Sequence, residues 1–136
     1  MTKTRPRVFI TRAIALHAVA KLRKHAIVEV WPRDTSTPYR ELMRRAANVD
    51  ALLTMVTDRI DANLIASAPK LRVISNLAVG LDNIDVAAAT AAGIAVGHTP
   101  GVLTDATADL AFALLMATAR RVAEGDREVR AGKWQT

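Results

Sequence analysis

The 136-residue chain contains no cysteine, which excludes disulfides, cysteine-ligated zinc and thiol catalysis. Aromatic residues make up only 4% of it, and this scarcity favours Ala- and Leu-rich helices over an all-β fold. The longest apolar run, residues 110–117, covers about two helical turns and is too short to cross a bilayer. We therefore expect no membrane partner, and we expect a cytoplasmic location.

Acidic residues are outnumbered: nineteen Lys and Arg against thirteen Asp and Glu give a net charge of +6. A basic chain can bind nucleic acid, membrane surfaces or small anions. Its arginines are dispersed, with doublets only at Arg44-Arg45 and Arg120-Arg121, and aromatic residues do not alternate with them. No stacking platform results, so we expect no nucleic-acid partner and interpret the charge as a solvated surface.

The common nucleotide and phosphate motifs are also missing. No strand is followed by G-x-G-x-x-G, and there is no P-loop. A flavodoxin would carry a hydroxyl-rich phosphate loop at residues 11–14, and a response-regulator receiver would carry an aspartate where Leu53 and Thr54 stand. The histidines His17, His25 and His98 show neither triad nor metal-ligand spacing, so a structural role is favoured for all three, although His98 lies near the expected ligand edge.

Short β-branched runs alternate with longer Ala- and Leu-rich stretches along the first hundred residues. The pattern predicts strands at residues 7–11, 27–31, 50–54, 71–75 and 94–96, with helices at 13–24, 38–47, 62–68 and 84–92. Thr37 and Asp61 are expected N-caps, and Gly93 is an expected helix stop. This alternation predicts an α/β fold: a flavodoxin-like, doubly wound parallel sheet of five strands in the order 2-1-3-4-5, which binds ligands at the carboxyl ends of its strands.

The pattern changes after the fifth strand. Residues 104–130 are expected to form one long connector helix capped by Thr104, and its first half is apolar on every side around residues 110–116. A helix of that kind must be covered all round, which predicts a missing partner: a second domain, a second subunit, or both. We place the domain boundary between residues 1–100 and residues 101–136.

Two loops at the expected ligand edge contain candidate site residues. In residues 76–85, Gly80 lets the backbone turn tightly and leaves space for a ligand, and consecutive N–H groups can form a nest for a carboxylate. Spacing alone favours an ordinary strand-to-helix turn here. In residues 98–109, Asp105 and Asp109 lie four apart, but Asp105 is better explained as a charge favoured at a helix N-terminus than as half of an acid–base pair.

Five segments together resemble D-isomer-specific 2-hydroxyacid dehydrogenases, and most closely glyoxylate/hydroxypyruvate reductases. They are VFITR at 8–12, VEVW at 28–31, DALLTM at 50–55, AVGLDNID at 78–85 and TPGVLTDATAD at 99–109, in the family's order. The resemblance implies that residues 1–100 are a substrate-binding domain and that residues 101–136 lead toward a missing Rossmann nucleotide-binding domain. It also implies that the loop at Ala78, Val79 and Gly80 holds the substrate carboxylate, that Met55 lines the pocket, and that Thr107 lies near the nicotinamide of the cofactor.

The resemblance further implies a reaction: glyoxylate or hydroxypyruvate, small 2-oxo acids, would be reduced to D-2-hydroxy acids by NADH or NADPH in a homodimer formed through residues 104–130. The family's catalytic Arg, Glu and His have no matching positions, so we expect no catalytic residue here, no bound cofactor, and an inactive isolated chain. The alternative is a stand-alone flavodoxin-like binding or interaction module with no catalytic role.

Overall fold

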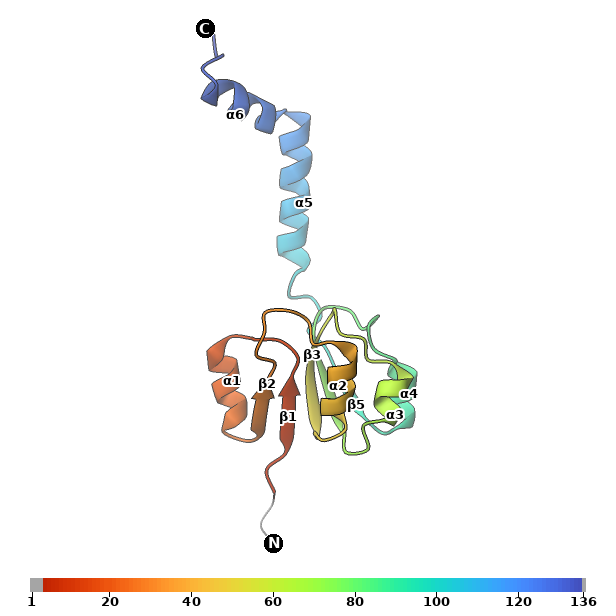
Figure 1. The fold of residues 1–136 in the computed structure, drawn as a ribbon. Helices are drawn as coiled ribbons and strands as arrows, with labels where there is room; N and C mark the ends of the chain where they lie inside the picture. Colours follow the sequence, from red (N-terminus) through yellow and green to blue (C-terminus); the bar gives the residue numbers. More distant parts are fainter. Residues whose placement is uncertain (1–3, 136) are drawn as a thin grey trace. The chain divides into compact units, whose positions relative to one another are not determined.

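The computed structural model describes residues 4–135 and divides the chain into two compact units, one ending at Pro100 and the other beginning at Gly101. The first unit is built on a parallel sheet with the order β2-β1-β3-β4-β5 (Figure 1). The strands are β1 (Arg7–Ile10), β2 (Ile27–Val30), β3 (Ala51–Met55), β4 (Val73–Leu77) and β5 (Ala95–Gly97). The predicted α/β class and strand order are confirmed.

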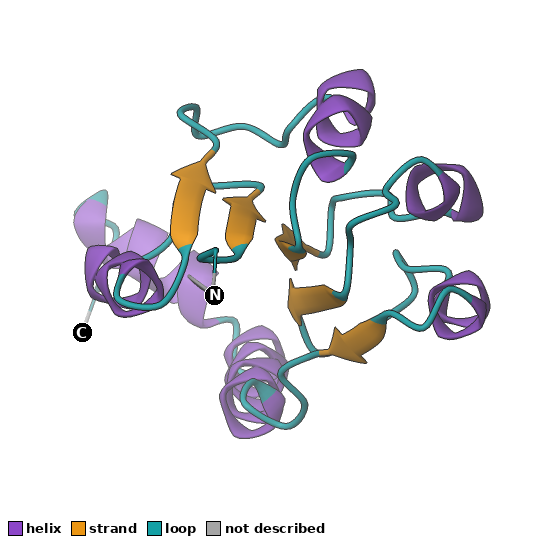
Figure 2. Cartoon of the chain, turned by 90° about the horizontal axis from the view of Figure 1, so that it is seen from below, coloured by secondary structure: helices purple, strands orange, loops and turns teal. Residues whose placement is uncertain are grey.

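Helices cover both faces of this sheet (Figure 2). They are α1 (Leu16–Arg23), α2 (Tyr39–Ala46), α3 (Ala62–Ala66) and α4 (Val86–Ala91). Val19 of α1 packs with Val8 and Ile10 of β1 on one face. The other three helices pack on the opposite face. On the α1 face, alternate residues of β4 such as Val73 and Leu77 remain exposed.

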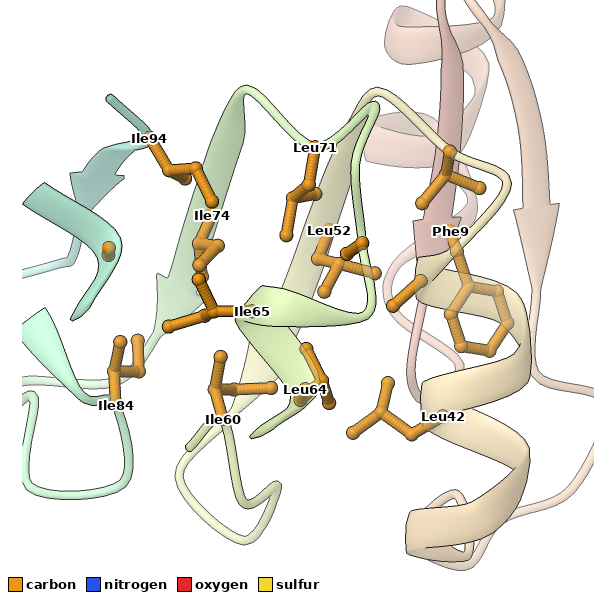
Figure 3. Close-up of a cluster of buried hydrophobic side chains, with 14 of the residues drawn as sticks. Phe9, Leu42, Leu52, Ile60, Leu64, Ile65, Leu71, Ile74, Ile84 and Ile94 are labelled. Atoms are coloured by element: carbon orange, nitrogen blue, oxygen red, sulfur yellow. The ribbon is translucent and has the colours of Figure 1, made fainter. Parts of the chain in front are cut away.

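The larger hydrophobic core lies between the sheet and helices α2, α3 and α4 (Figure 3). Alternate strand residues point into it because side chains of a strand face opposite sides of a sheet. Phe9, Leu52 and Ile74 supply the sheet side, and Leu42 and Leu64 supply the helix side, each with at most 1% of its surface exposed. This packing fixes the strand ends that carry the candidate site.

The helix ends in this unit agree with two of the three predicted signals. The Asp61 side chain accepts a hydrogen bond from the Leu64 N–H at 3.0 Å, which confirms it as the N-cap of α3. Gly93 follows α4 with φ of 70°, a left-handed conformation that favours glycine. Thr37 does not cap α2: its hydroxyl donates to the Thr11 carbonyl at 2.8 Å, and Pro38 takes the cap position.

The second unit contains two helices, so the prediction of one long connector helix is wrong. Helix α5 (Thr104–Ala119) and helix α6 (Val122–Arg130) are separated at Arg121, whose φ of 51° and ψ of 38° are left-handed. The Arg121 carbonyl then accepts hydrogen bonds from the N–H groups of Glu124 and Gly125, which begins α6. Thr104 is the first residue of α5 and not its cap; Leu103 holds the cap position without a side-chain hydrogen bond.

Large apolar side chains of α5 lie at the surface. Leu110, Phe112, Leu114 and Leu115 are each more than half exposed. None of the helices formed by residues 4–135 combines the length and apolarity that crossing a membrane requires.

One polar contact joins α2 to the start of α3. The Tyr39 hydroxyl donates to the Asp61 carboxylate at 2.6 Å, and this bond is the main reason why the pKa of Asp61 is lowered and that of Tyr39 is raised. On α2 itself, hydrogen bonds from Arg44 and then Arg45 lower the pKa of Glu41 from 4.5 to about 2.

Because of these lowered pKa values, the free energy of unfolding depends on pH in the acid range. A carboxyl whose pKa is depressed by folding contributes stability above its unfolded pKa and loses it as pH falls through the folded pKa. We expect the free energy of unfolding to fall as pH drops from about 4.5 toward about 2. Tyr39→Phe should destabilise the protein at neutral pH by an amount that shrinks in acid. Urea unfolding at a series of pH values measures the stability of the unaltered protein and of Tyr39→Phe. If the two proteins differed in stability by the same amount at every pH, the Tyr39–Asp61 hydrogen bond would not be the cause of the lowered pKa of Asp61.

Candidate functional site

The loops that follow β3, β4 and β5 come together at the carboxyl edge of the sheet. Met55, the last residue of β3, pairs in register with Leu77, the last residue of β4. Ala78, Val79 and Gly80 continue directly from Leu77, while His98 and Thr99 continue from the neighbouring strand β5. The predicted substrate-binding residues Met55, Ala78, Val79 and Gly80 are therefore adjacent, at the edge where parallel sheets bind ligands.

Three consecutive carbonyl groups of this loop are held by protein donors. The Ala78 carbonyl accepts from the Thr99 N–H at 2.9 Å and from the Thr99 hydroxyl at 3.1 Å. The Val79 carbonyl lies 2.7 Å from Nδ1 of His98, and the Gly80 carbonyl accepts from Nδ2 of Asn76 at 3.0 Å. The backbone between Ala78 and Gly80 is thus fixed through its oxygen atoms.

The N–H groups of the same loop remain free. No acceptor in residues 4–135 takes a hydrogen bond from the backbone N–H of Ala78, Val79 or Gly80. Val79 is 41% exposed, and Gly80 is also exposed. A trans peptide plane directs its C=O and N–H to opposite sides, so holding the carbonyls on the protein side leaves the following amides directed away from it. Adjacent free amides of this kind form a site for an anion such as a carboxylate.

Two asparagines, Asn76 buried and Asn83 partly buried, connect the β3 and β4 loops. Asn76, 1% exposed, accepts from the Thr54 hydroxyl at 3.0 Å and donates to Oδ1 of Asn83 at 2.9 Å as well as to Gly80. Asn83 in turn donates to the carbonyls of Met55 at 3.1 Å and Asp58 at 2.9 Å. Because a buried amide left without partners is costly, this network holds the two loops at a fixed separation.

A buried carboxylate, that of Asp58, holds the loop after β3 in place. Asp58, 3% exposed, accepts from the Met55 N–H at 2.7 Å and from the hydroxyl of Thr11, which is fully buried at the end of β1. Thr11 also holds its neighbour strand, since its N–H donates to the Leu53 carbonyl at 3.0 Å. The position of Met55 is thus determined by three strands and not by its own loop alone.

The structure contradicts one of the two roles predicted for Gly80, that of permitting a tight turn. Its φ lies outside the left-handed region, and a Cβ added to it would meet its nearest neighbour, the Asp82 carboxylate, at 3.4 Å, an ordinary contact. A tight turn therefore does not require glycine at this position. The exposed backbone at this position leaves its N–H accessible.

The cavity next to this loop is lined by several acidic side chains, unlike the free amides of residues 78–80. A cavity of about 380 Å³ lies between residues 56–61 and residues 82–85. Its lining includes the carboxylates of Asp58, Asp61, Asp82 and Asp85, and only Arg59 is basic. Its charge opposes a carboxylate ligand, and residues 4–135 contain no cluster of side chains suited to a metal ion. The free amides, at an open edge, are the better candidate for anion binding.

The residues present do not form a dinucleotide site by themselves. The sequence has no G-x-G-x-x-G fingerprint, the segment that would hold the pyrophosphate at a helix N-terminus. Thr107 lies in the first turn of α5, where its N–H donates to the Leu103 carbonyl at 2.9 Å, and its side chain is exposed. Contact between Thr107 and a nicotinamide stays a prediction.

Several supporting residues were outside the predicted site. Asn76, Asn83 and Thr99 had no assigned role, and a structural role was expected for His98. All four hold the loop carbonyls or the groups that support them. Asn76 lies near the end of β4, and the other three residues follow parallel strands, which is a signal for this edge of the sheet. Their bonding partners, however, lie up to 28 residues away in sequence.

The chain is similar to known proteins in sequence and in fold. Glyoxylate reductase of Thermococcus kodakarensis is 52% identical over 131 residues, which are 96% of this chain and 39% of that protein. A crystal structure of a Thermus thermophilus protein aligns with a TM-score of 0.85 and 46% identity, over 96% of this chain and 42% of the other. The NADPH-dependent glyoxylate/hydroxypyruvate reductase of Sinorhizobium meliloti, in complex with NADP and malonate, aligns with a TM-score of 0.74 and 27% identity, over 96% and 40% of the two chains.

The chain thus spans about 40% of the length of these relatives. Residues 8–131 match the model of the D-isomer specific 2-hydroxyacid dehydrogenase catalytic domain. On this match, and on the similarity of fold and sequence, the chain belongs to the D-isomer specific 2-hydroxyacid dehydrogenase family.

Proposed function

We propose that this chain is the carboxylate-binding part of an oxidoreductase that reduces glyoxylate or hydroxypyruvate to a D-2-hydroxy acid. One observation carries the proposal: the loop after β4 has its carbonyls bonded to the protein and its amides free. In this role the amides of Val79 and Gly80 bind the carboxylate of the 2-oxo acid. Met55, held beside them, lines the pocket.

In the complete reaction a hydride from NADH or NADPH and a proton convert the 2-oxo acid to the hydroxy acid. NAD(P)H supplies the hydride when bound, and Thr107 is the residue of this chain proposed to lie near its nicotinamide. Residues 1–100 act as the substrate-binding domain, and residues 101–136 connect it to a nucleotide-binding domain. The chain by itself binds and orients the carboxylate but does not turn it over.

The exposed apolar residues of α5 support a further part of this proposal, a homodimer formed through residues 104–130. Leu110, Phe112, Leu114 and Leu115 present a large apolar surface from one helix, and such surfaces commonly mark protein–protein contacts.

Titration of the isotope-labelled chain with oxalate, a stable analogue of a 2-oxo acid, tests carboxylate binding. We expect the amide resonances of Val79 and Gly80 to shift on addition of oxalate. Gly80→Pro should lose binding, because proline has no N–H to donate. The uncharged diamide oxamide should leave these resonances in place.

Gly80→Ala is the matched control, since it keeps the N–H and its Cβ fits the available space. It should fold normally and retain most of the affinity for oxalate. The proposal fails if oxalate shifts no amide between residues 78 and 80, or if Gly80→Pro folds and binds oxalate as the unaltered chain does.

A further inference from the structure

The three loop carbonyls differ in how they are held. The Ala78 carbonyl has two donors from Thr99, one of them a backbone N–H that no substitution other than proline removes. The Gly80 carbonyl has a buried donor, Asn76. The Val79 carbonyl depends on a single exposed side chain, that of His98, with Nδ1 at 2.7 Å. Its orientation is therefore the one that an exposed side chain controls.

The geometry of the peptide unit ties this contact to ligand binding. The Val79 carbonyl and the Gly80 N–H belong to one planar trans peptide, so they point in opposite directions and rotate together. A donor that holds the carbonyl against β5 also directs the Gly80 N–H away from β5. His98 therefore governs the direction of one of the two amides assigned to the carboxylate.

The contact also selects one tautomer of the neutral ring. A carbonyl oxygen can only accept, so the bond forms only when Nδ1 carries a hydrogen. In neutral His98 this leaves Nε2 without a hydrogen, so one tautomer is selected.

We propose that His98 is a positioning residue for carboxylate binding, which holds the Val79 carbonyl so that the Gly80 N–H is directed toward the ligand. This role rests on the proposed function of the loop. It acts through the backbone and requires no contact between the imidazole and the substrate.

Oxalate affinity tests the role with three variants. We expect His98→Ala to weaken oxalate binding about three- to ten-fold, the effect of losing one hydrogen bond. His98→Asn should restore affinity to within about two-fold, because its amide places an N–H near the position of Nδ1. His25→Ala, a change at an exposed histidine next to β2, should bind as the unaltered chain does. The thermal unfolding of all three should match that of the unaltered chain.

The tautomer of His98 can be measured without any ligand, and it tests whether Nδ1 donates to the Val79 carbonyl. Long-range proton–nitrogen correlation at about pH 8.5, above the ordinary histidine pKa, should show hydrogen on Nδ1 of His98. Hydrogen on Nε2 instead, or equal oxalate affinity in His98→Ala and the unaltered chain, overturns the role while leaving the proposed function intact. Failure of the unaltered chain to bind oxalate overturns the proposed function, and the role of His98 with it.

Discussion

Replacing Asn76 by leucine should lower the free energy of unfolding by about 3–5 kcal/mol and abolish oxalate binding. The substitution leaves the fully buried Thr54 hydroxyl without its acceptor. It also removes the donor of the Gly80 carbonyl and of the Asn83 side-chain oxygen, both in partly buried contacts. Each buried polar group left unpaired costs about 1–3 kcal/mol. The β4 loop also loses the donor that holds its last carbonyl, so its amides are no longer aligned.

Urea unfolding and oxalate titration measure the two effects, and Asn63→Leu on the exposed side of α3 is the matched control. The control should change stability by no more than about 0.5 kcal/mol. Asn76→Asp provides a variant that keeps the shape of the side chain but places a carboxylate oxygen against the Gly80 carbonyl. It should fold less stably and bind oxalate weakly. If Asn76→Leu left the free energy of unfolding unchanged, the hydrogen bonds of Asn76 would contribute nothing to stability.

The second large effect concerns the hydrophobic core. Leu64→Ala should cost about 2–5 kcal/mol, because the side chain is fully buried between helices and sheet in the cluster of Figure 3. Removing it deletes contacts and leaves a cavity that neighbouring residues fill only in part. Since a domain of this size is stable by only about 5–15 kcal/mol, one truncation removes a large share of the total.

Leu16→Ala makes the same chemical change at a residue that is 86% exposed. It should alter the free energy of unfolding by no more than about 0.5 kcal/mol. Chemical denaturation of the two variants side by side separates burial from the loss of leucine itself. Equal effects would contradict the assignment of Leu64 to the core.

The arrangement of the sheet could be predicted because local and long-range signals agree. Each β-branched run is followed by a helix that returns the chain to the same edge, and this alternation permits few topologies. Asp61 was predictable as a cap because its bond is local, reaching Leu64 three residues later. The family resemblance then identified the loop at Val79 and Gly80, whose position at the carboxyl edge the fold confirms.

Most of the errors arise because a side chain bonds to a partner that is distant in the sequence. The Thr37 hydroxyl could have capped α2, but it bonds to Thr11, 26 residues away. The interruption at Arg121 depends on a left-handed residue that is not glycine, which helix propensity does not indicate. Likewise the bonds of Asn76, Asn83 and His98 depend on which strands are neighbours and on their register, so residue spacing alone could not reveal them.

In the proposed function, main-chain amides bind the carboxylate, so the side chains around it can be exchanged without loss of those contacts. Val79 projects into the open, and Met55 is only partly covered. Exchanging either would reshape the surface facing the rest of the substrate while leaving the peptide groups and their interior supports intact. Under this proposal, substitutions at these two positions would change which organic acid is preferred while the backbone contacts to the carboxylate are kept.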